Sequence, residues 1–178
     1  MTDLRFVARD LRRLDETSAE VIACGVWRDE RPFGGLAGLL DWRLAGRLSR
    51  LAKQAFLVGD VGEALACPAR PRLPFDKVII FGQGPRSAFA EATFRQVTER
   101  MLSTLAGLSV KKAVIELPGR GDGAIEPERA AEIALELLEK DERDAITFVE
   151  EGEAQRRMEK HAQDRRRTVL RAQSAATR

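Results

Sequence analysis

Tyrosine and asparagine are both absent from this chain of 178 residues, and histidine occurs once. The lone histidine, His161, leaves a metal site without a second imidazole and lies far along the chain from any cysteine or strained serine turn. The two cysteines, Cys24 and Cys67, lie in separate apolar runs, so we expect buried reduced thiols rather than a disulfide framework. No pair of carboxylates with ligand-like spacing ends a predicted strand. The inventory therefore predicts neither a metal centre nor a catalytic triad.

Long hydrophobic runs are also missing. No segment approaches the roughly 18 consecutive apolar residues that a membrane span requires. Charges interrupt the apolar pairs of the N-terminus, so we expect no signal peptide and a cytoplasmic location. The 30 basic and 28 acidic residues nearly balance, which does not favour nucleic acid as a partner. With 44% hydrophobic residues, the composition predicts a globular domain rather than a disordered chain.

The apolar pattern predicts strands alternating with helices. We expect strands at 4–7, 21–27, 63–68, 77–81, 110–117 and 145–149, and helices at 36–51, 87–106 and 128–140. Ser87 is in position to N-cap the second helix. Trp27 and Trp42 are interpreted as packing residues. The order of elements predicts an α/β fold, with right-handed crossovers onto a mostly parallel or mixed sheet.

The C-terminal stretch differs from the rest of the chain in its charge. Residues 153–178 carry eight basic and three acidic side chains, so residues 1–152 are net acidic. We predict an α/β domain over 1–152 and a basic helical tail over 153–178, solvated and fraying toward its end. A docking arm for an acidic partner and a contact with nucleic acid are the alternatives for this tail.

Two glycine-rich loops follow predicted strands, at the edge where α/β sheets bind ligands. Residues 82–87 read Gly-Gln-Gly-Pro-Arg-Ser and lead into a helix, whose first amides could hold an anion beside Arg86. A plain strand-to-helix turn is the alternative, because the third glycine of the dinucleotide fingerprint is missing and Pro85 removes a donor. The second loop, 118–123, combines an arginine with three glycines. The candidate ligand-binding residues are Gly82, Gly84, Arg86, Ser87, Gly119, Arg120 and Gly121.

Several segments also occur in a recognisable order. The strand at 21–27 is followed by LLDWRLAGRL at 39–48, FLVGDVGE at 56–63 and VIIFGQG at 78–84, then by a long helix and a strand at 113–117. This order resembles the N-terminal domain of the cytosolic leucine aminopeptidase family over more than half of the chain. The resemblance implies a three-layer, macro-domain-like mixed sheet flanked by helices, and a role in building that family's hexamer.

The same resemblance implies what this chain lacks. In the family the chemistry lies in a separate C-terminal domain with two metal ions, a catalytic lysine and an arginine in an Asn-Thr-Asp-Ala-Glu-Gly-Arg segment. A chain without asparagine cannot contain that segment. We therefore predict no catalytic residue, no metal ligand, no cofactor and no enzyme activity for this chain on its own.

Three functions follow as hypotheses. The first is a non-catalytic module for oligomerisation or for docking on a protein partner. The second is a macro-like module that binds ADP-ribose or another phosphate-containing small ligand. The third is a regulatory subunit of a separately encoded metallo-aminopeptidase.

Overall fold

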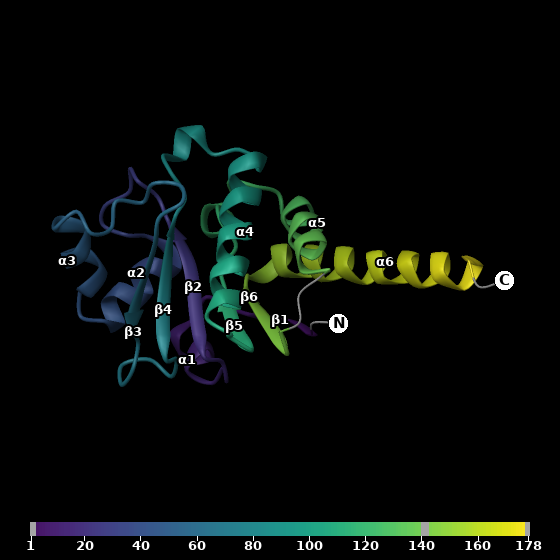
Figure 1. Ribbon diagram of the computed structural model, residues 1–178, viewed down its shortest axis with the longest axis horizontal. Coiled ribbons are helices and arrows are strands. Elements are labelled where there is room, and N and C mark those ends of the chain that lie inside the picture. The colour runs from purple at the N-terminus through teal and green to yellow at the C-terminus, as the bar shows by residue number, and fades with distance from the viewer. Residues whose placement is uncertain (1–2, 140–142, 177–178) are drawn as a thin grey trace.

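Six strands form one mixed sheet in the order β1-β6-β5-β2-β4-β3 (Figure 1). The computed structural model describes residues 3–139 and 143–176. The strands are β1 (Asp3–Val7), β2 (Val21–Val26), β3 (Ala64–Pro68), β4 (Lys77–Gly82), β5 (Lys112–Ile115) and β6 (Ala145–Val149). Neighbouring strands run parallel except that β3 pairs antiparallel with β4. The predicted mixed sheet is confirmed.

Helices cover both faces of this sheet. They are α1 (Leu11–Asp15), α2 (Gly35–Arg43), α3 (Arg47–Lys53), α4 (Glu91–Gly107), α5 (Pro127–Leu138) and α6 (Gly152–Ala176), with 3-10 turns η1 (Arg86–Ala88) and η2 (Arg120–Asp122). The side chains of α4 and α5 pack on one face, and those of α1, α2 and α3 pack on the other. The three-layer, macro-domain-like α/β class is therefore confirmed.

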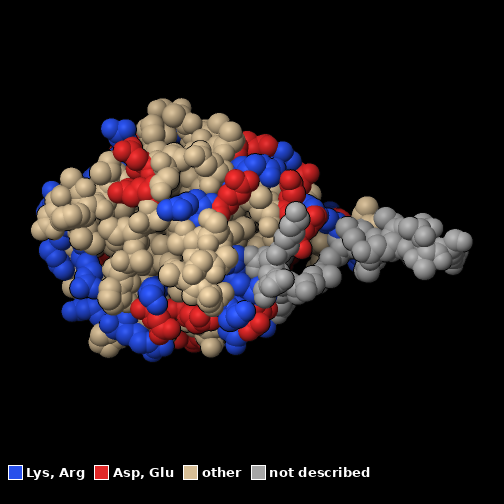
Figure 2. All heavy atoms as spheres, viewed as in Figure 1, with Lys and Arg blue, Asp and Glu red and all other residues tan. Residues whose placement is uncertain are grey.

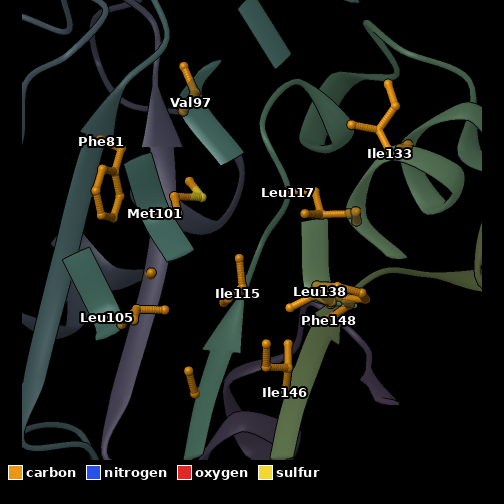
Figure 3. Close-up of a cluster of buried hydrophobic side chains, with 14 of the residues drawn as sticks. Phe81, Val97, Met101, Leu105, Ile115, Leu117, Ile133, Leu138, Ile146 and Phe148 are labelled. Carbon is orange, nitrogen blue, oxygen red and sulfur yellow. The ribbon is translucent and has the colours of Figure 1, made fainter. Parts of the chain in front are cut away.

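The central strands are apolar on both faces because each face carries its own core. On β2, Val21 and Ala23 face the α4–α5 layer, whereas Ile22 and Cys24 face the α2 layer. Figure 3 shows the α4–α5 core, in which side chains from α4 and α5 meet those of the central strands. Full burial of one such aliphatic side chain contributes about 1.5–3 kcal/mol. Two packed faces hold the strand ends, and the loops beyond them, in fixed positions.

The prediction of one helix over 36–51 is wrong, because two helices occupy this range. Ala45 and Gly46 separate α2 from α3 with left-handed φ values of 54° and 72°. Asp41 then accepts hydrogen bonds from the backbone and hydroxyl of Ser49, at 3.1 and 2.5 Å, and so anchors the first turn of α3. Gly46 was the sequence signal for this break.

The start of the next helix was also placed too early. Helix α4 begins at Glu91, whereas Ser87 lies in η1 and caps nothing in α4. The N-cap residue of α4 is Ala90, which has no side-chain acceptor. The strand predicted at 110–117 is confined to β5, and α1 was not predicted at all. Of the helix predicted at 128–140, the last residue lies outside the described residues.

The two tryptophans differ in exposure, whereas both cysteines are buried. Trp27 is 2% exposed, as the packing interpretation predicted, but Trp42 is 72% exposed, so that interpretation is wrong for Trp42. Cys24 and Cys67 are both buried and free, which confirms the expected reduced thiols. Burial raises the pKa of each thiol, so neither is an activated nucleophile.

The C-terminal helix α6 begins against the body of the protein and then extends away from it (Figure 1). Met158 on α6 is 1% exposed within the α4–α5 core. Arg157 pairs with Glu126 at 2.9 Å and with Glu128 at 2.6 Å, beside and on α5. The division into 1–152 and 153–178 stays a prediction. Across residues 3–139 and 143–176, no helix is apolar over the length that a membrane crossing needs.

Candidate functional site

The carboxyl ends of β2, β4 and β5 lie side by side, and the loops that follow them enclose a cavity of about 110 Å³. We refer to this cavity and its walls as the cleft. The residues that line the cleft are Gly25, Trp27, Glu30, Gly34, Gly35, Gln83, Arg86, Glu116, Gly119, Gly121 and Asp122. It occupies the edge of the sheet at which the sequence predicted a ligand site.

The two predicted glycine-rich loops meet inside the cleft. The backbone N–H of Gly119 donates to Oε1 of Gln83 across a distance of 2.6 Å. The Gln83 side chain passes so close to β2 that a Cβ on Gly25 would stand 2.3 Å from its Cδ. A glycine at position 25 is therefore what allows Gln83 to reach the second loop.

Arg86 crosses the mouth of the cleft. Its guanidinium pairs with Asp122 at 2.6 Å and with Glu30 at 3.0 Å, and it lies 5.2 Å from the centre of the Trp27 ring. The indole N–H of Trp27 also donates to Asp122, at 2.7 Å. The backbone N–H of Arg86 donates to Asp29 at 3.1 Å. The charge of Arg86 is thus matched by carboxylates of this chain rather than held ready for an anion.

The backbone amides of the first loop are also engaged. The N–H groups of Gly82, Gln83 and Gly84 donate to the carbonyls of Glu63, Val26 and Gly59 at 2.8–3.0 Å. Ser87 is exposed in η1. Because these N–H groups already donate to carbonyls, residues 82–84 offer no free backbone donor to a phosphate.

Arg120 lies beneath the second loop, not in the cleft. Its side chain is 6% exposed and pairs with Glu150 at 2.7 Å, and it also donates to the carbonyl of Ile125. Of the seven candidate residues, Arg86, Gly119 and Gly121 line the cleft, whereas Gly82, Gly84, Ser87 and Arg120 do not. The assignment of all seven as ligand-binding residues stays a prediction.

The sequence interpretation missed Glu116, the residue that follows β5. It is 6% exposed, lines the cleft and accepts a hydrogen bond from Nε of Arg9 at 2.8 Å. The pKa of Glu116 is raised to about 7, mainly by burial and also by Glu150 and Asp122, against the lowering effect of Arg9. The sequence signal that could have identified Glu116 is its position as a charged residue directly after a buried strand. Within the described ranges, no three histidine, cysteine or acidic side chains come together as metal ligands would.

Solved structures of the same fold define the class of protein. The macrodomain of Mycobacterium tuberculosis DarG aligns with a TM-score of 0.67 and 14% identity, over 85% of this chain and 100% of that one. An Oceanobacillus iheyensis macrodomain with ADP gives a TM-score of 0.66 and 16% identity over 89% and 88% of the two chains. A tomato leucine aminopeptidase gives 0.63 and 14%, over 91% of this chain and 36% of that one. At these identities the likeness establishes a macrodomain-type fold.

Sequence comparison then specifies the family. The family model for the N-terminal domain of the cytosol aminopeptidase family matches residues 21–144. The chain belongs to this family, as its ordered motifs predicted. A probable cytosol aminopeptidase of Azotobacter vinelandii is 29% identical over 102 residues, and one of Haemophilus ducreyi is 25% identical over 101. Each match covers 57% of this chain and 20% of the relative, so the chain spans about a fifth of the length of these relatives.

Proposed function

We propose that this chain is a non-catalytic module that associates with a second copy of itself through the α2–α3 layer. The observation that carries the proposal is the exposure of two large aromatic side chains there. Trp42, on α2, is 72% exposed, and Phe56, just after α3, is 66% exposed. Aromatic residues dominate the energetics of protein interfaces when a partner buries them.

The neighbourhood of these aromatics supports an interface. The opposite side of the same helices is anchored in the core, because Leu40 and Leu48 are fully buried. Basic residues gather along this flank of the molecule (Figure 2), and α3 contributes Arg47, Arg50 and Lys53. Aromatic residues and arginines are both enriched in protein interfaces. A stable interface buries about 800 Å² per partner.

Family membership supports the non-catalytic half of the proposal. The matched segment is the N-terminal domain, and the chain spans about a fifth of its curated relatives. The catalytic residues that the family resemblance implies belong to the remainder of those relatives. The assembling role of this domain in the family favours a second copy as the partner.

The test is the molar mass in solution, measured by light scattering from about 10 to 200 μM protein. We expect the mass to rise above the 19.8 kDa of one chain, and to return to it when Trp42→Ser and Phe56→Ser are combined. Leu108→Ser is the matched control, because Leu108 is 47% exposed on the α4 side of the sheet. A wild-type mass fixed at one chain, or an unchanged mass in the double variant, would falsify self-association. Binding only to an added metallo-aminopeptidase chain would favour the regulatory-subunit alternative.

The macrodomain fold makes a phosphate ligand the second candidate. Against it, the cleft presents three carboxylates, Glu30, Glu116 and Asp122, and one arginine that two of them already neutralise. A diphosphate would be repelled there. We expect no saturable heat when ADP-ribose is added up to about 1 mM. Binding stronger than about 100 μM that Arg86→Ala weakens would instead establish the phosphate-binding function.

A further inference from the structure

The cleft contains a buried carboxylate with one uncommitted oxygen. Glu116 is 6% exposed, and its Oε1 accepts a hydrogen bond from Arg9. No side chain or backbone group among the described residues donates a hydrogen bond to its Oε2. Gly121 faces this carboxylate, and a Cβ there would lie 3.4 Å from Oε2. The missing side chain at position 121 therefore leaves space directly beside a charged acceptor.

The lining of the cleft is acidic overall. Glu30, Glu116 and Asp122 contribute three carboxylates, and Arg86 is the lining residue of opposite charge. Arg9 pairs with Glu116 from outside the cavity, with 21% of its side chain exposed. A ligand with positive charge would replace the hydration that Glu116 loses by burial.

The mouth of the cleft already holds one cationic group, the guanidinium of Arg86. This guanidinium lies against two carboxylates and the face of an indole ring, which is the arrangement that recognises organic cations in proteins. Further in, the cavity of about 110 Å³ has room for a few non-hydrogen atoms. This inner space reaches Glu116, which Arg86 does not contact.

We propose that the cleft binds a primary alkylammonium group. Its N–H donors would reach Oε2 of Glu116 and the carboxylate of Asp122, and its aliphatic stem would pass Trp27 toward solvent. A primary ammonium fits because it is compact and has three donors, whereas a guanidinium is planar and larger. The group belongs either to a free amine or to a peptide, as a lysine side chain or an N-terminus.

The protonation of Glu116 gives this site a pH dependence. The charged groups that act on Glu116 are Arg9, Glu150 and Asp122, and burial is the largest influence on its pKa of about 7. Only the ionised form attracts a cation, so affinity should rise about tenfold between pH 6 and pH 8. An alkylammonium stays charged throughout this range, since its pKa lies above about 10.

The two tryptophans provide the assay. The indole N–H of Trp27 donates to Asp122 in the cleft, whereas that of Trp42 lies on an exposed helix and serves as an internal control. We expect added propylammonium to shift the Trp27 indole signal in ¹H–¹⁵N spectra saturably, with a dissociation constant of about 1–10 mM at pH 8. The Trp42 signal should stay in place.

Two variants remove the site in different ways. Glu116→Gln keeps the shape but removes the charge, and should weaken binding at least tenfold and abolish its dependence on pH. Gly121→Ala places a methyl group 3.4 Å from Oε2 of Glu116 and should weaken binding while leaving Glu116 ionisable. Glu16→Gln, on a 71% exposed side chain, is the charge-matched control and should bind as the wild type does. A well-dispersed ¹H–¹⁵N spectrum without ligand establishes that each variant is folded.

The source of the ammonium group is distinguished by the probe. An N-acetylated lysine amide should bind as propylammonium does, whereas glycinamide should lose affinity above about pH 8, where an α-amino group is deprotonated. Tetramethylammonium, which has no N–H donor, should not bind. A non-saturable Trp27 shift, equal binding of tetramethylammonium, or unchanged affinity in Glu116→Gln would each overturn the proposal.

Discussion

The two glycine-rich loops resemble each other in the sequence and have opposite roles in the structure. Each follows a central strand and carries one arginine among glycines. Arg86 leaves 45% of its side chain exposed and bridges carboxylates across the cleft, whereas Arg120 leaves 6% exposed and pairs with Glu150. The difference lies in the position of the acidic partner of each arginine. Glu150 follows β6, the strand beside β5, so it draws Arg120 under the sheet edge.

A glycine-rich motif with an arginine does not by itself decide between binding and packing. In the first loop the acids come from other loops, Glu30 after β2 and Asp122 in η2, and their side chains are 34% and 30% exposed. In the second loop the acid comes from the end of a neighbouring strand. The same side chain is therefore a surface bridge in one case and part of the interior in the other.

The largest effect that we expect comes from breaking the buried pair. Arg120→Ala leaves Glu150 charged and 5% exposed without its partner, and should lower the free energy of unfolding by about 3–5 kcal/mol. Arg86→Ala, the matched change in the first loop, should cost no more than about 1 kcal/mol because its pairs are half-exposed. Urea unfolding measures both. Equal losses in the two variants would refute the division of roles.

The next effect concerns the pH dependence of stability. Because Glu116 has a folded pKa of about 7 against an ordinary 4.5, the folded protein holds a proton that the unfolded chain has lost between these values. The stabilisation that this group provides is full below 4.5 and is lost as pH rises through 7. From pH 5 to pH 8, Glu116→Gln should therefore gain about 2–3 kcal/mol relative to the wild type. Parallel stability curves for the two proteins would contradict the raised pKa.

Glycine substitutions sharpen the contrast further. Gly119 has a left-handed φ of 68°, and a Cβ there would stand 2.7 Å from the ring of Phe89, which packs on Trp27. Gly119→Ala should destabilise the fold by about 2 kcal/mol. Gly84 has a φ of 77°, but its Cβ would meet only the 38% exposed Val61 at 3.0 Å. Gly84→Ala should cost about 1 kcal/mol, as measured by thermal unfolding, and a larger loss than in Gly119→Ala would reverse this order.

The smallest effect tests the start of α4. Ser87 makes no capping bond, so Ser87→Ala should change stability by less than about 0.5 kcal/mol. Ala90→Ser places an acceptor at the actual N-cap and should stabilise by about 0.5–1 kcal/mol. Calorimetric melting of the two variants compares them directly. A loss of more than 1 kcal/mol in Ser87→Ala would restore Ser87 as the cap.

The sequence predicted best where a single local pattern decides the outcome. The buried runs of β2 and β4 are apolar on both faces, so these strands could be found without knowing their neighbours. The predicted start of α4 is too early because the chain before it forms η1. A hydrogen bond from the Arg86 amide to Asp29, in another loop, holds η1 in place. A contact between residues so far apart in sequence leaves no periodic signal.

Some features of the candidate site could likewise be predicted from local patterns, and others could not. The two loops and the edge of the sheet could be predicted, because parallel strands end together and glycines mark their turns. The burial of Arg120 and the position of Glu116 in the cleft could not, since both depend on the order β6-β5-β2. Strand order is set by contacts between distant segments, and the pattern of one strand does not reveal its neighbours.

The length of α6 has a consequence for how the protein moves through water. Its 25 residues make a rod of about 37 Å, and Figure 1 shows most of this rod beyond the sheet and its covering helices. The ion pairs of Arg157 fix its base to α5, so the rod turns with the body rather than trailing behind it. Such a particle has a larger frictional coefficient than a sphere of equal mass. A single copy will therefore elute early from a gel-filtration column and tumble anisotropically in solution.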